Sequence, residues 1–184
     1  DIPCLGIDPA ANSAKVAREK GAATLIEFFT TLSAQALSTQ RGQADLILGN
    51  NVFAHVPDVN DFIRCVSILL KADGILTLEF PHLAQMIKNN QFDTIYDEHF
   101  SYFSFQVAQK ILTRHGLRVF DVEELLTHEG SLRIFACQST NESLQEKQTV
   151  NDLLEVERSQ GLTDSSGYVK FQSQAEAIRD DFRK

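Results

Sequence analysis

The sequence lacks the cysteine spacing that zinc clusters and disulfide frameworks require. Its 184 residues include three cysteines, Cys4, Cys65 and Cys137, which lie far apart and form no CxxC pair. An odd number of widely spaced cysteines predicts free thiols, buried or half-buried, in a reducing compartment. We therefore expect neither a disulfide nor a metal site.

Long apolar runs and an excess of positive charge are missing as well. No run approaches the roughly 20 apolar residues of a membrane-spanning helix, and no signal peptide opens the chain, so we expect a cytoplasmic protein with no membrane partner. Lys and Arg number 17 against 25 Asp and Glu, which gives a formal net charge of −8. Nucleic acids bind basic faces, so this balance argues against a nucleic-acid partner. A small anionic substrate stays compatible with it, because one pocket can bind such a molecule locally.

The chain also lacks an initiator Met. It begins at Asp1, and the apolar run from Cys4 to Ile7 already has the pattern of a buried strand. We therefore expect this chain to be an excerpt or a processed fragment. Its length is typical of one domain with room for an appendage.

Strand patterns alternate with helix patterns over most of the chain. Strands are expected at 4–7, within 22–29, and at 45–49, 75–80, 117–124 and 132–137, the last two as an antiparallel pair. Apolar residues at helical spacing predict helices at 10–20, 32–41, 58–73 and 104–116. This order predicts an α/β fold, with the apolar strand at 45–49 covered on both faces.

Residues 139–184 have a different pattern. Residues 139–148 are polar and are expected to form a linker, and a short helix is expected around 150–156. A later apolar stripe at helical spacing predicts a second, amphipathic helix whose apolar face needs a partner; it consists of Tyr168, Phe171, Ala175, Ile178 and Phe182. We therefore divide the chain into a core at 1–138 and a linker with a helical segment at 139–184.

Polar side chains follow two of the expected strands. Asp8 and Pro9 come after the first strand, and Asn50 and Asn51 come after the third, with His55 close behind. Ligands of open α/β sheets bind at the carboxyl ends of the strands, where an acid commonly accepts hydrogen bonds from ribose hydroxyls. The alternative for Asp8 is a turn or helix cap, and the alternative for the two Asn residues is a local turn.

Titratable side chains crowd the stretch from Glu79 to Tyr102, directly after the fourth strand. Within it, Glu98 and His99 are flanked by Tyr96 and Tyr102. Removing a proton from carbon beside a keto group needs a base near neutral pKa, which His supplies at about 6.5. It also needs a donor for the developing enolate oxygen, which Tyr can provide. The alternative is that Glu98 and His99 form a solvated surface pair.

Four segments carry a family resemblance: Gly6 to Pro9, Asn50 to Asp58, Glu79 to Tyr102 with its Asp-Thr-Ile-Tyr-x-Glu-His-Phe-Ser-Tyr block, and Phe120 to Arg133. In this order they resemble the S-adenosylmethionine-dependent sugar C-methyltransferases, which methylate nucleotide-linked 4-keto deoxysugars. The resemblance implies a class I methyltransferase fold, a Rossmann-like sheet with helices on both faces. It implies His99 as base, with Tyr96, Glu98 and His55 around the sugar. Asp8 would hold the cofactor ribose with Pro9 beside it, and Asn50 and Asn51 would lie near S-adenosylmethionine.

The chain departs from the family pattern at both ends. It has no clustered Cys ahead of the fold, no first strand with a Gly-rich turn, and no C-terminal domain beyond Phe182. The first strand of this fold lies between the strands that end at Asp8 and Gly49, so we expect unpaired strand edges. We predict weak or absent binding of S-adenosylmethionine by the isolated chain, and self-association through these edges or the C-terminal helix.

Two other functions are considered. The chain could be a non-catalytic fragment or remnant of such an enzyme that cannot hold cofactor. A nicotinamide-dependent sugar enzyme is disfavoured because the sequence contains neither a Tyr-xxx-Lys pair nor a GxGxxG motif. The composition and motifs do not distinguish which sugar or which carbon would react.

Overall fold

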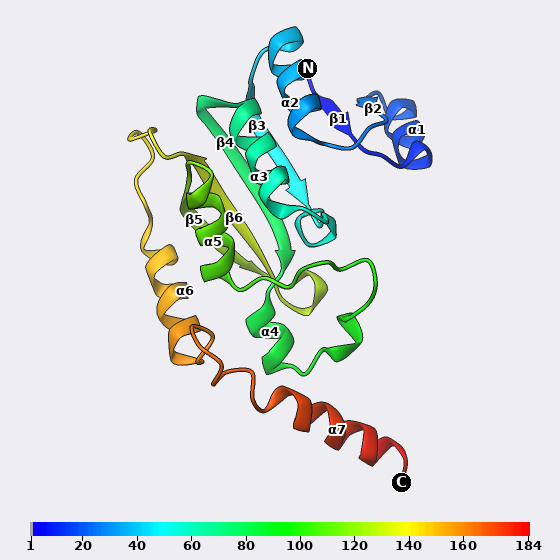
Figure 1. The fold of residues 1–184 in the computed structure, drawn as a ribbon, viewed down its shortest axis with the longest axis vertical. Helices are drawn as coiled ribbons and strands as arrows, with labels where there is room; N and C mark the ends of the chain where they lie inside the picture. Colours follow the sequence, from blue (N-terminus) through cyan, green and yellow to red (C-terminus); the bar gives the residue numbers. More distant parts are fainter. Residues whose placement is uncertain (1) are drawn as a thin grey trace.

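Two β-sheets organise the chain. The structure, a computed structural model, describes residues 2–184, with every side chain in that range except that of His128. The strands are β1 (Leu5–Ile7), β2 (Ala23–Leu25), β3 (Ala44–Asn50), β4 (Leu70–Pro81), β5 (Leu117–Leu125) and β6 (Ser131–Gln138). β1 and β2 pair in parallel, and the other four form a sheet of order β3-β4-β6-β5 (Figure 1). β3 and β4 are parallel, whereas β6 is antiparallel to both β4 and β5.

Helices connect the strands, which confirms the α/β class. They are α1 (Ala11–Glu19), α2 (Thr31–Arg41), α3 (Val59–Leu69), α4 (Leu83–Lys88), α5 (Phe105–Arg114), α6 (Gln148–Ser159) and α7 (Phe171–Phe182). Short 3-10 helices lie at η1 (Phe53–His55), η2 (Phe92–Thr94) and η3 (Thr127–Glu129). Among the α-helices, α4 was not expected from the sequence.

The helix expected at 58–73 ends earlier than predicted. α3 ends at Leu69, and Leu70 already belongs to β4. Gly74 therefore does not stop a helix; it lies within the strand, where a Cβ atom would stand 2.9 Å from the carbonyl oxygen of Ala44. The glycine is needed because the backbones of β3 and β4 approach closely there.

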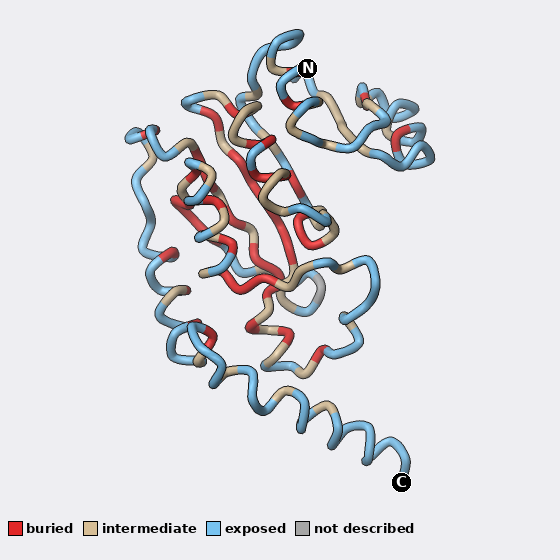
Figure 2. The backbone as a smooth tube through the Cα atoms, in the orientation of Figure 1, coloured by how far each residue is buried: buried red, intermediate tan, exposed pale blue. Residues whose placement is uncertain are grey.

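One face of the larger sheet forms the core. Leu76, Leu78 and Phe80 of β4 are buried there together with apolar residues of β6, α3 and α5. Figure 1 shows α3 and α5 lying against this sheet, and Figure 2 shows much of β4, β5 and β6 as buried. Helix α5 begins at its expected cap, because the Ser104 hydroxyl accepts a hydrogen bond from the amide of Val107 at 3.3 Å.

The outer strand β3 is less covered than expected. Leu46 and Leu48 are 53% and 66% exposed, so the strand buries one face and leaves apolar side chains on the other. Among the described residues, β4 is the only strand hydrogen-bonded to β3, and β1 pairs only with β2. Self-association through such an edge stays a prediction.

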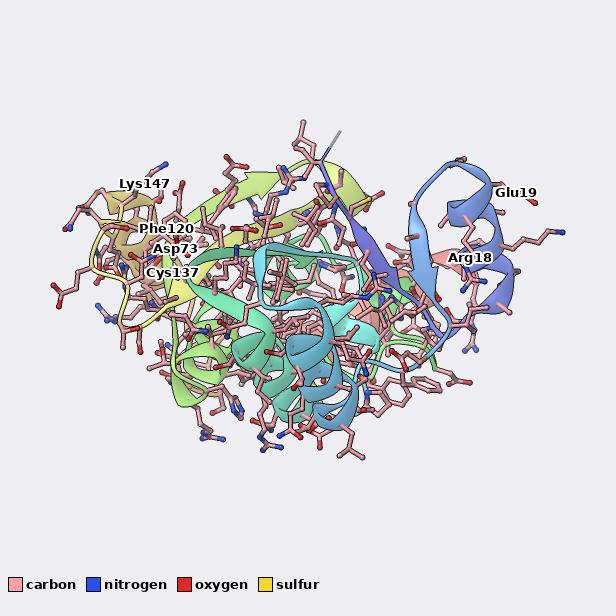
Figure 3. All side chains as sticks on the ribbon, turned by 90° about the horizontal axis from the view of Figure 1, so that it is seen from above. Arg18, Glu19, Asp73, Phe120, Cys137 and Lys147 are labelled. Atoms are coloured by element: carbon pink, nitrogen blue, oxygen red, sulfur yellow. The ribbon has the colours of Figure 1, made fainter. Side chains whose placement is uncertain are left out.

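The unit of β1, α1 and β2 is held together locally. The Arg18 guanidinium in α1 donates hydrogen bonds to the carbonyl oxygen of Thr24 in β2. Viewed from above in Figure 3, Arg18 and Glu19 lie at one end of the molecule and Lys147 at the other. Asp8 directly follows β1 and so lies at the end of the small sheet, whereas Asn50 ends β3 in the larger one.

The cysteines are free, as expected, but they are not all buried. Cys65 and Cys137 are buried, whereas Cys4 is exposed because it precedes the first strand in an extended segment. Burial and the nearby Asp61 carboxylate raise the pKa of the Cys65 thiol to about 11. No helix within residues 2–184 combines the length and apolarity of a membrane span.

The C-terminal segment attaches to the core through α6. Val150, Leu153 and Glu157 of α6 are buried, and the helix packs against α5 and β5. At its start, the Asp121 carboxylate of β5 accepts hydrogen bonds from Lys147 at 2.5 Å and from Thr149 at 2.8 Å. Helix α7 follows with no buried residues, and Figure 1 shows it extending away from the sheets. The two expected helices of this segment are confirmed.

Candidate functional site

A cavity opens at the carboxyl ends of β3 and β4. The two strands are parallel and end together, with Asn50 opposite Glu79. Chain segments that follow them enclose a cavity of about 280 Å³. Side chains that can form hydrogen bonds or transfer a proton line it, among them Asn51, His55, His82, Tyr96, His99 and Tyr102. This is the edge of the sheet at which open α/β folds bind ligands.

Backbone contacts bring the two lining segments together. The amides of Phe100 and Ser101 donate hydrogen bonds to the carbonyl oxygen of Ala54, at 2.9 and 3.3 Å. From the other side, His55 Nδ1 lies 2.8 Å from the carbonyl oxygen of Glu98 and donates to it. The segment after β3 and the segment after β4 therefore form one wall of the cavity, although about 45 residues of chain separate them.

His99 lies at the centre of this wall, and its contacts determine its tautomer. Its Nδ1 lies 3.0 Å from the carbonyl oxygen of Thr94, which can only accept, so Nδ1 carries the proton. In the neutral ring Nε2 then bears the lone pair, and it accepts a hydrogen bond from the Tyr96 hydroxyl at 3.0 Å. A base with a fixed orientation and an adjacent O–H donor is the arrangement that enolate formation requires.

Aromatic rings surround His99. The ring centroids of His99 and Tyr96 are 4.2 Å apart, and that of His55 lies 4.7 Å from His99. Tyr102 meets His99 edge to face at 5.7 Å. Of the four side chains predicted for catalysis, the structure thus brings three together, His99, Tyr96 and His55.

Glu98 differs from these three. It contributes its backbone carbonyl to His55, whereas its side chain is exposed. Within residues 2–184 no hydrogen bond or ion pair reaches its carboxylate. Its predicted catalytic role therefore requires contact with a bound substrate.

The residues predicted to bind the cofactor are not grouped by mutual contacts in the way that His99, Tyr96 and His55 are. Asn51 adopts a left-handed backbone with φ of 53°, which Asn tolerates well, and its amide donates to the carbonyl oxygen of Glu79 at 2.8 Å. Its side-chain oxygen is buried and has no hydrogen-bond partner in the described part of the chain. A buried acceptor without a partner at the edge of a cavity fits a ligand that donates. Asn50 is exposed and is not among the cavity-lining residues.

Asp8 at the end of β1 makes a local turn. Its carboxylate accepts a hydrogen bond from the amide of Ala10 at 2.8 Å. This is the turn that the alternative interpretation predicted, and it leaves the second carboxylate oxygen available to a ligand. Asp8 and Pro9 lie outside the cavity that contains His99.

Two acidic residues have structural contacts that the sequence pattern did not predict. Glu79 is buried beneath η3, where it binds Thr127 at 3.1 Å and Arg133 at 2.8 Å, and it does not line the cavity. Glu157 of α6 is fully buried and lies 2.8 Å from Nε2 of His82. Its one sequence signal is its position on the buried face of α6 with Val150 and Leu153, at spacings of three and four residues.

The fold and the position of the cavity define a class I methyltransferase type of α/β protein. Residues 2–122 match the family model described as a methyltransferase domain, and this match covers more than half of the chain. The chain belongs to the methyltransferase-domain family. Residues 126–184 match the model described as a C-methyltransferase C-terminal domain.

Known proteins agree with this assignment. The chain is 39% identical over 180 residues to C-methyltransferase NovU from Streptomyces niveus. The matched segment covers 98% of this chain and 43% of that protein. The chain thus spans less than half the length of this curated relative.

Solved structures show the same fold at low identity. The magnesium protoporphyrin IX methyltransferase of Synechocystis, solved with bound SAH, has a TM-score of 0.55 at 15% identity, over 73% of this chain and 64% of its own. A SAM-dependent methyltransferase from Methanosarcina mazei has a TM-score of 0.55 at 19% identity, over 73% of this chain and 81% of its own.

Proposed function

We infer that the chain provides the reaction site of an S-adenosylmethionine-dependent C-methyltransferase whose substrate is a nucleotide-linked 4-keto deoxysugar. The observation that carries this proposal is the orientation of His99, a cavity-lining residue whose Nδ1 is held by the Thr94 carbonyl and whose Nε2 is paired with the Tyr96 hydroxyl. Family membership and the likeness to a C-methyltransferase support the reaction class. The Asp93 to Tyr102 block, which resembles the sugar-modifying family, supports the substrate class.

His99 acts as the base in this mechanism. When the sugar binds, the Tyr96 O–H turns from Nε2 to the keto oxygen, and this frees the Nε2 lone pair. Nε2 then removes a proton from the carbon next to the keto group, and the electrons of the C–H bond form an enolate. The Tyr96 O–H stabilises the enolate oxygen as charge develops there, while the abstracted proton stays on Nε2. The contact of Nδ1 with Thr94 holds the ring in place throughout.

The neighbouring side chains hold the sugar. His55 is oriented by its hydrogen bond to the Glu98 carbonyl, so its other ring nitrogen is available to a hydroxyl or carbonyl oxygen. The exposed Glu98 carboxylate can accept hydrogen bonds from sugar hydroxyls. A cavity of about 280 Å³ is near the lower limit of small-molecule sites and suits one sugar ring, with the nucleotide outside it.

The cofactor side fits S-adenosylmethionine. When bound, the cofactor would supply a methyl group to the enolate carbon, with its sulfur–methyl bond breaking and S-adenosylhomocysteine leaving. Asn51 has a buried acceptor oxygen without a partner, which suits the ammonium of the methionine portion. Asn50 beside it and Asp8 with Pro9 at the end of β1 are proposed to contact the same molecule, Asp8 through the ribose hydroxyls.

Methyl transfer by the natural full-length protein tests this function. The protein is incubated with methyl-labelled S-adenosylmethionine and a nucleotide-linked 4-keto deoxysugar, and the label is located in the product. We expect a new carbon–methyl bond beside the keto group. His99→Asn should abolish transfer while cofactor binding persists, and His115→Asn, outside the cavity, is the matched control. Label on an oxygen or nitrogen atom, or no transfer by the wild type, would contradict the proposal.

A further inference from the structure

The catalytic side chains are carried by a long connection between β4 and α5. It runs from 83 to 104, and apart from the short elements α4 and η2 it has no regular structure. Tyr96 and Glu98 are exposed and His99 is half-buried, so the core does not fix them directly. Contacts with Ala54 and His55 hold residues 98–101, and the two ends of the connection need an anchor of their own.

The two ends of the connection meet at its base. The amide of Leu83 donates to the carbonyl oxygen of Phe103 at 3.0 Å, and His82 forms a parallel β-bridge with Phe103. The 83–104 connection is therefore a loop with a closed base, and its position depends on how this base is anchored.

Glu157 is located at that base. It projects from α6, is 0% exposed, and accepts three hydrogen bonds. One comes from His82 Nε2 at 2.8 Å, at the first end of the connection. The other two come from the amides of Phe105 at 2.5 Å and Gln106 at 2.8 Å, at its second end. A single carboxylate thus joins both ends of the connection that carries the proposed base.

The electrostatics of this contact favour a carboxylate. The first amides of a helix have no partner within the helix, and its dipole favours negative charge there. Glu157 takes the amides of Phe105 and Gln106, and the Ser104 hydroxyl takes that of Val107, so the start of α5 is satisfied. Burying a carboxylate is costly unless its acceptor sites are occupied, and here three donors occupy them.

His82 connects the carboxylate to the cavity. Its side chain is 2% exposed, it is one of the cavity-lining residues, and its Nδ1 is buried without a partner among the described residues. Since Nε2 donates to Glu157, the ring is held in one orientation, and Nδ1 is the atom left for further contact.

We propose that Glu157, together with His82, is a positioning residue of the methyltransferase site. It ties both ends of the 83–104 connection to α6 and thereby fixes His99 and Tyr96 relative to the cavity. The segment after β6 then contributes to the reaction, although its side chains do not touch the reacting atoms. The expected effect on turnover rests on the proposed function, whereas the effect on the connection does not.

Glu157→Gln tests the tie in the natural full-length protein. The amide has nearly the same size but presents a donor to a site where all three partners donate. Misplacing reacting groups by about 1 Å costs on the order of 100-fold in rate, so we expect kcat to fall by that factor. The affinity for S-adenosylmethionine should stay the same. Amide hydrogen exchange in peptides covering 92–104 should accelerate on the order of ten-fold, while exchange in β4 and β6 stays slow.

Two further variants make the result decisive. Glu155→Gln lies on the same helix with a side chain that is 66% exposed, and it should change kcat and exchange by less than about two-fold. His82→Leu keeps the contact of Glu157 with α5 and loosens only the first end, so it serves if Glu157→Gln does not fold. It should also accelerate exchange at 92–104.

The outcomes separate this proposal from the proposed function. If amide exchange at 92–104 in Glu157→Gln or His82→Leu stays at the wild-type rate, the proposed anchoring of the connection by Glu157 is wrong, regardless of the measured activity. A loss of kcat without faster exchange would overturn it as well. If the variants exchange faster but the wild type methylates no ketosugar, the proposed function is wrong and the anchoring role of Glu157 is still supported.

Discussion

The residues proposed to bind the substrate (the substrate side) and those proposed to bind the cofactor (the cofactor side) differ in how many contacts within the chain hold them in place. On the substrate side, His99, Tyr96 and His55 contact one another or the backbone, and both ring nitrogens of His99 have partners. On the cofactor side, Asn50 is exposed, and Asp8 belongs to a separate small sheet. Asn51 has a buried oxygen without a partner.

This difference follows from where the two sides come from in the fold. The substrate side is built on β3 and β4, which are neighbours in one sheet and are joined by contacts such as that of Phe100 with Ala54. The cofactor side combines residues from the ends of β1 and β3, which are not hydrogen-bonded to each other. Preorganised groups stabilise charge without reorganisation, so in the proposed mechanism the proton transfer is the step for which this chain is best preorganised.

In the natural full-length protein, Tyr96→Phe should lower kcat strongly and leave the binding of S-adenosylmethionine unchanged. It removes the O–H that donates to His99 Nε2 and, in the mechanism, to the enolate oxygen. Removing one such donor costs about 100-fold in kcat, and the dissociation constant for S-adenosylmethionine should not change. Steady-state kinetics and calorimetry measure both, with Tyr168→Phe in the C-terminal segment as control. A weaker cofactor affinity with unchanged kcat would show that the two sides are not separate.

Asn51→Gly should act on the other side. Glycine keeps the left-handed backbone at φ of 53° and removes only the side chain. A hydrogen bond to a charged group contributes about 1.5–3 kcal/mol, so the dissociation constant for S-adenosylmethionine should rise roughly ten-fold or more. At saturating cofactor kcat should be nearly unchanged. Equal affinity in Asn51→Gly and in the exposed control Asn89→Gly would remove Asn51 from the cofactor site.

Asp121 belongs to neither the substrate side nor the cofactor side, so Asp121→Asn should change only the free energy of unfolding. Burial would raise the pKa of this carboxyl, but hydrogen bonds from Lys147, Thr149 and the Val122 amide hold it below its ordinary value. A depressed folded pKa stabilises the fold above the unfolded pKa of about 3.9, and this contribution is lost as the pH falls through the folded pKa. Since Lys147 is largely exposed, Asp121→Asn should lower the free energy of unfolding by only about 1 kcal/mol at neutral pH.

Urea unfolding at several pH values measures this effect. The difference between wild type and Asp121→Asn should shrink as the solution is made acidic, because the wild-type carboxyl then becomes protonated too. A difference that stays constant down to strongly acidic pH would show that the charge of Asp121 does not hold α6 to β5.

The sequence predicts those features that depend on local patterns. The alternation of strands and helices, the Ser104 cap and the pairing of 117–125 with 131–138 are all recovered. The grouping of His99, Tyr96 and His55 was also expected, because strand ends that meet at one sheet edge bring their loops together.

Features that depend on contacts between distant segments could not be predicted in the same way. Gly74 has the pattern of a helix stop, and its real role depends on the approach of β3. Leu46 and Leu48 lie in an apolar run that is typical of a fully covered strand, yet both are exposed. Glu157 binds His82, which lies 75 residues away in the chain, and the start of α5, which lies about 50 residues away, so no local pattern reveals these partners.

The most direct test of the account is proton removal without methyl transfer. The natural full-length protein is incubated in deuterium oxide with the nucleotide-linked 4-keto deoxysugar and S-adenosylhomocysteine, which has no methyl group to transfer. Deuterium at the carbon beside the keto group is then followed by NMR. We predict rapid incorporation by the wild type and a rate lower by about 100-fold or more in His99→Asn. Equal rates of incorporation in the two proteins would contradict the assignment of His99 as the base.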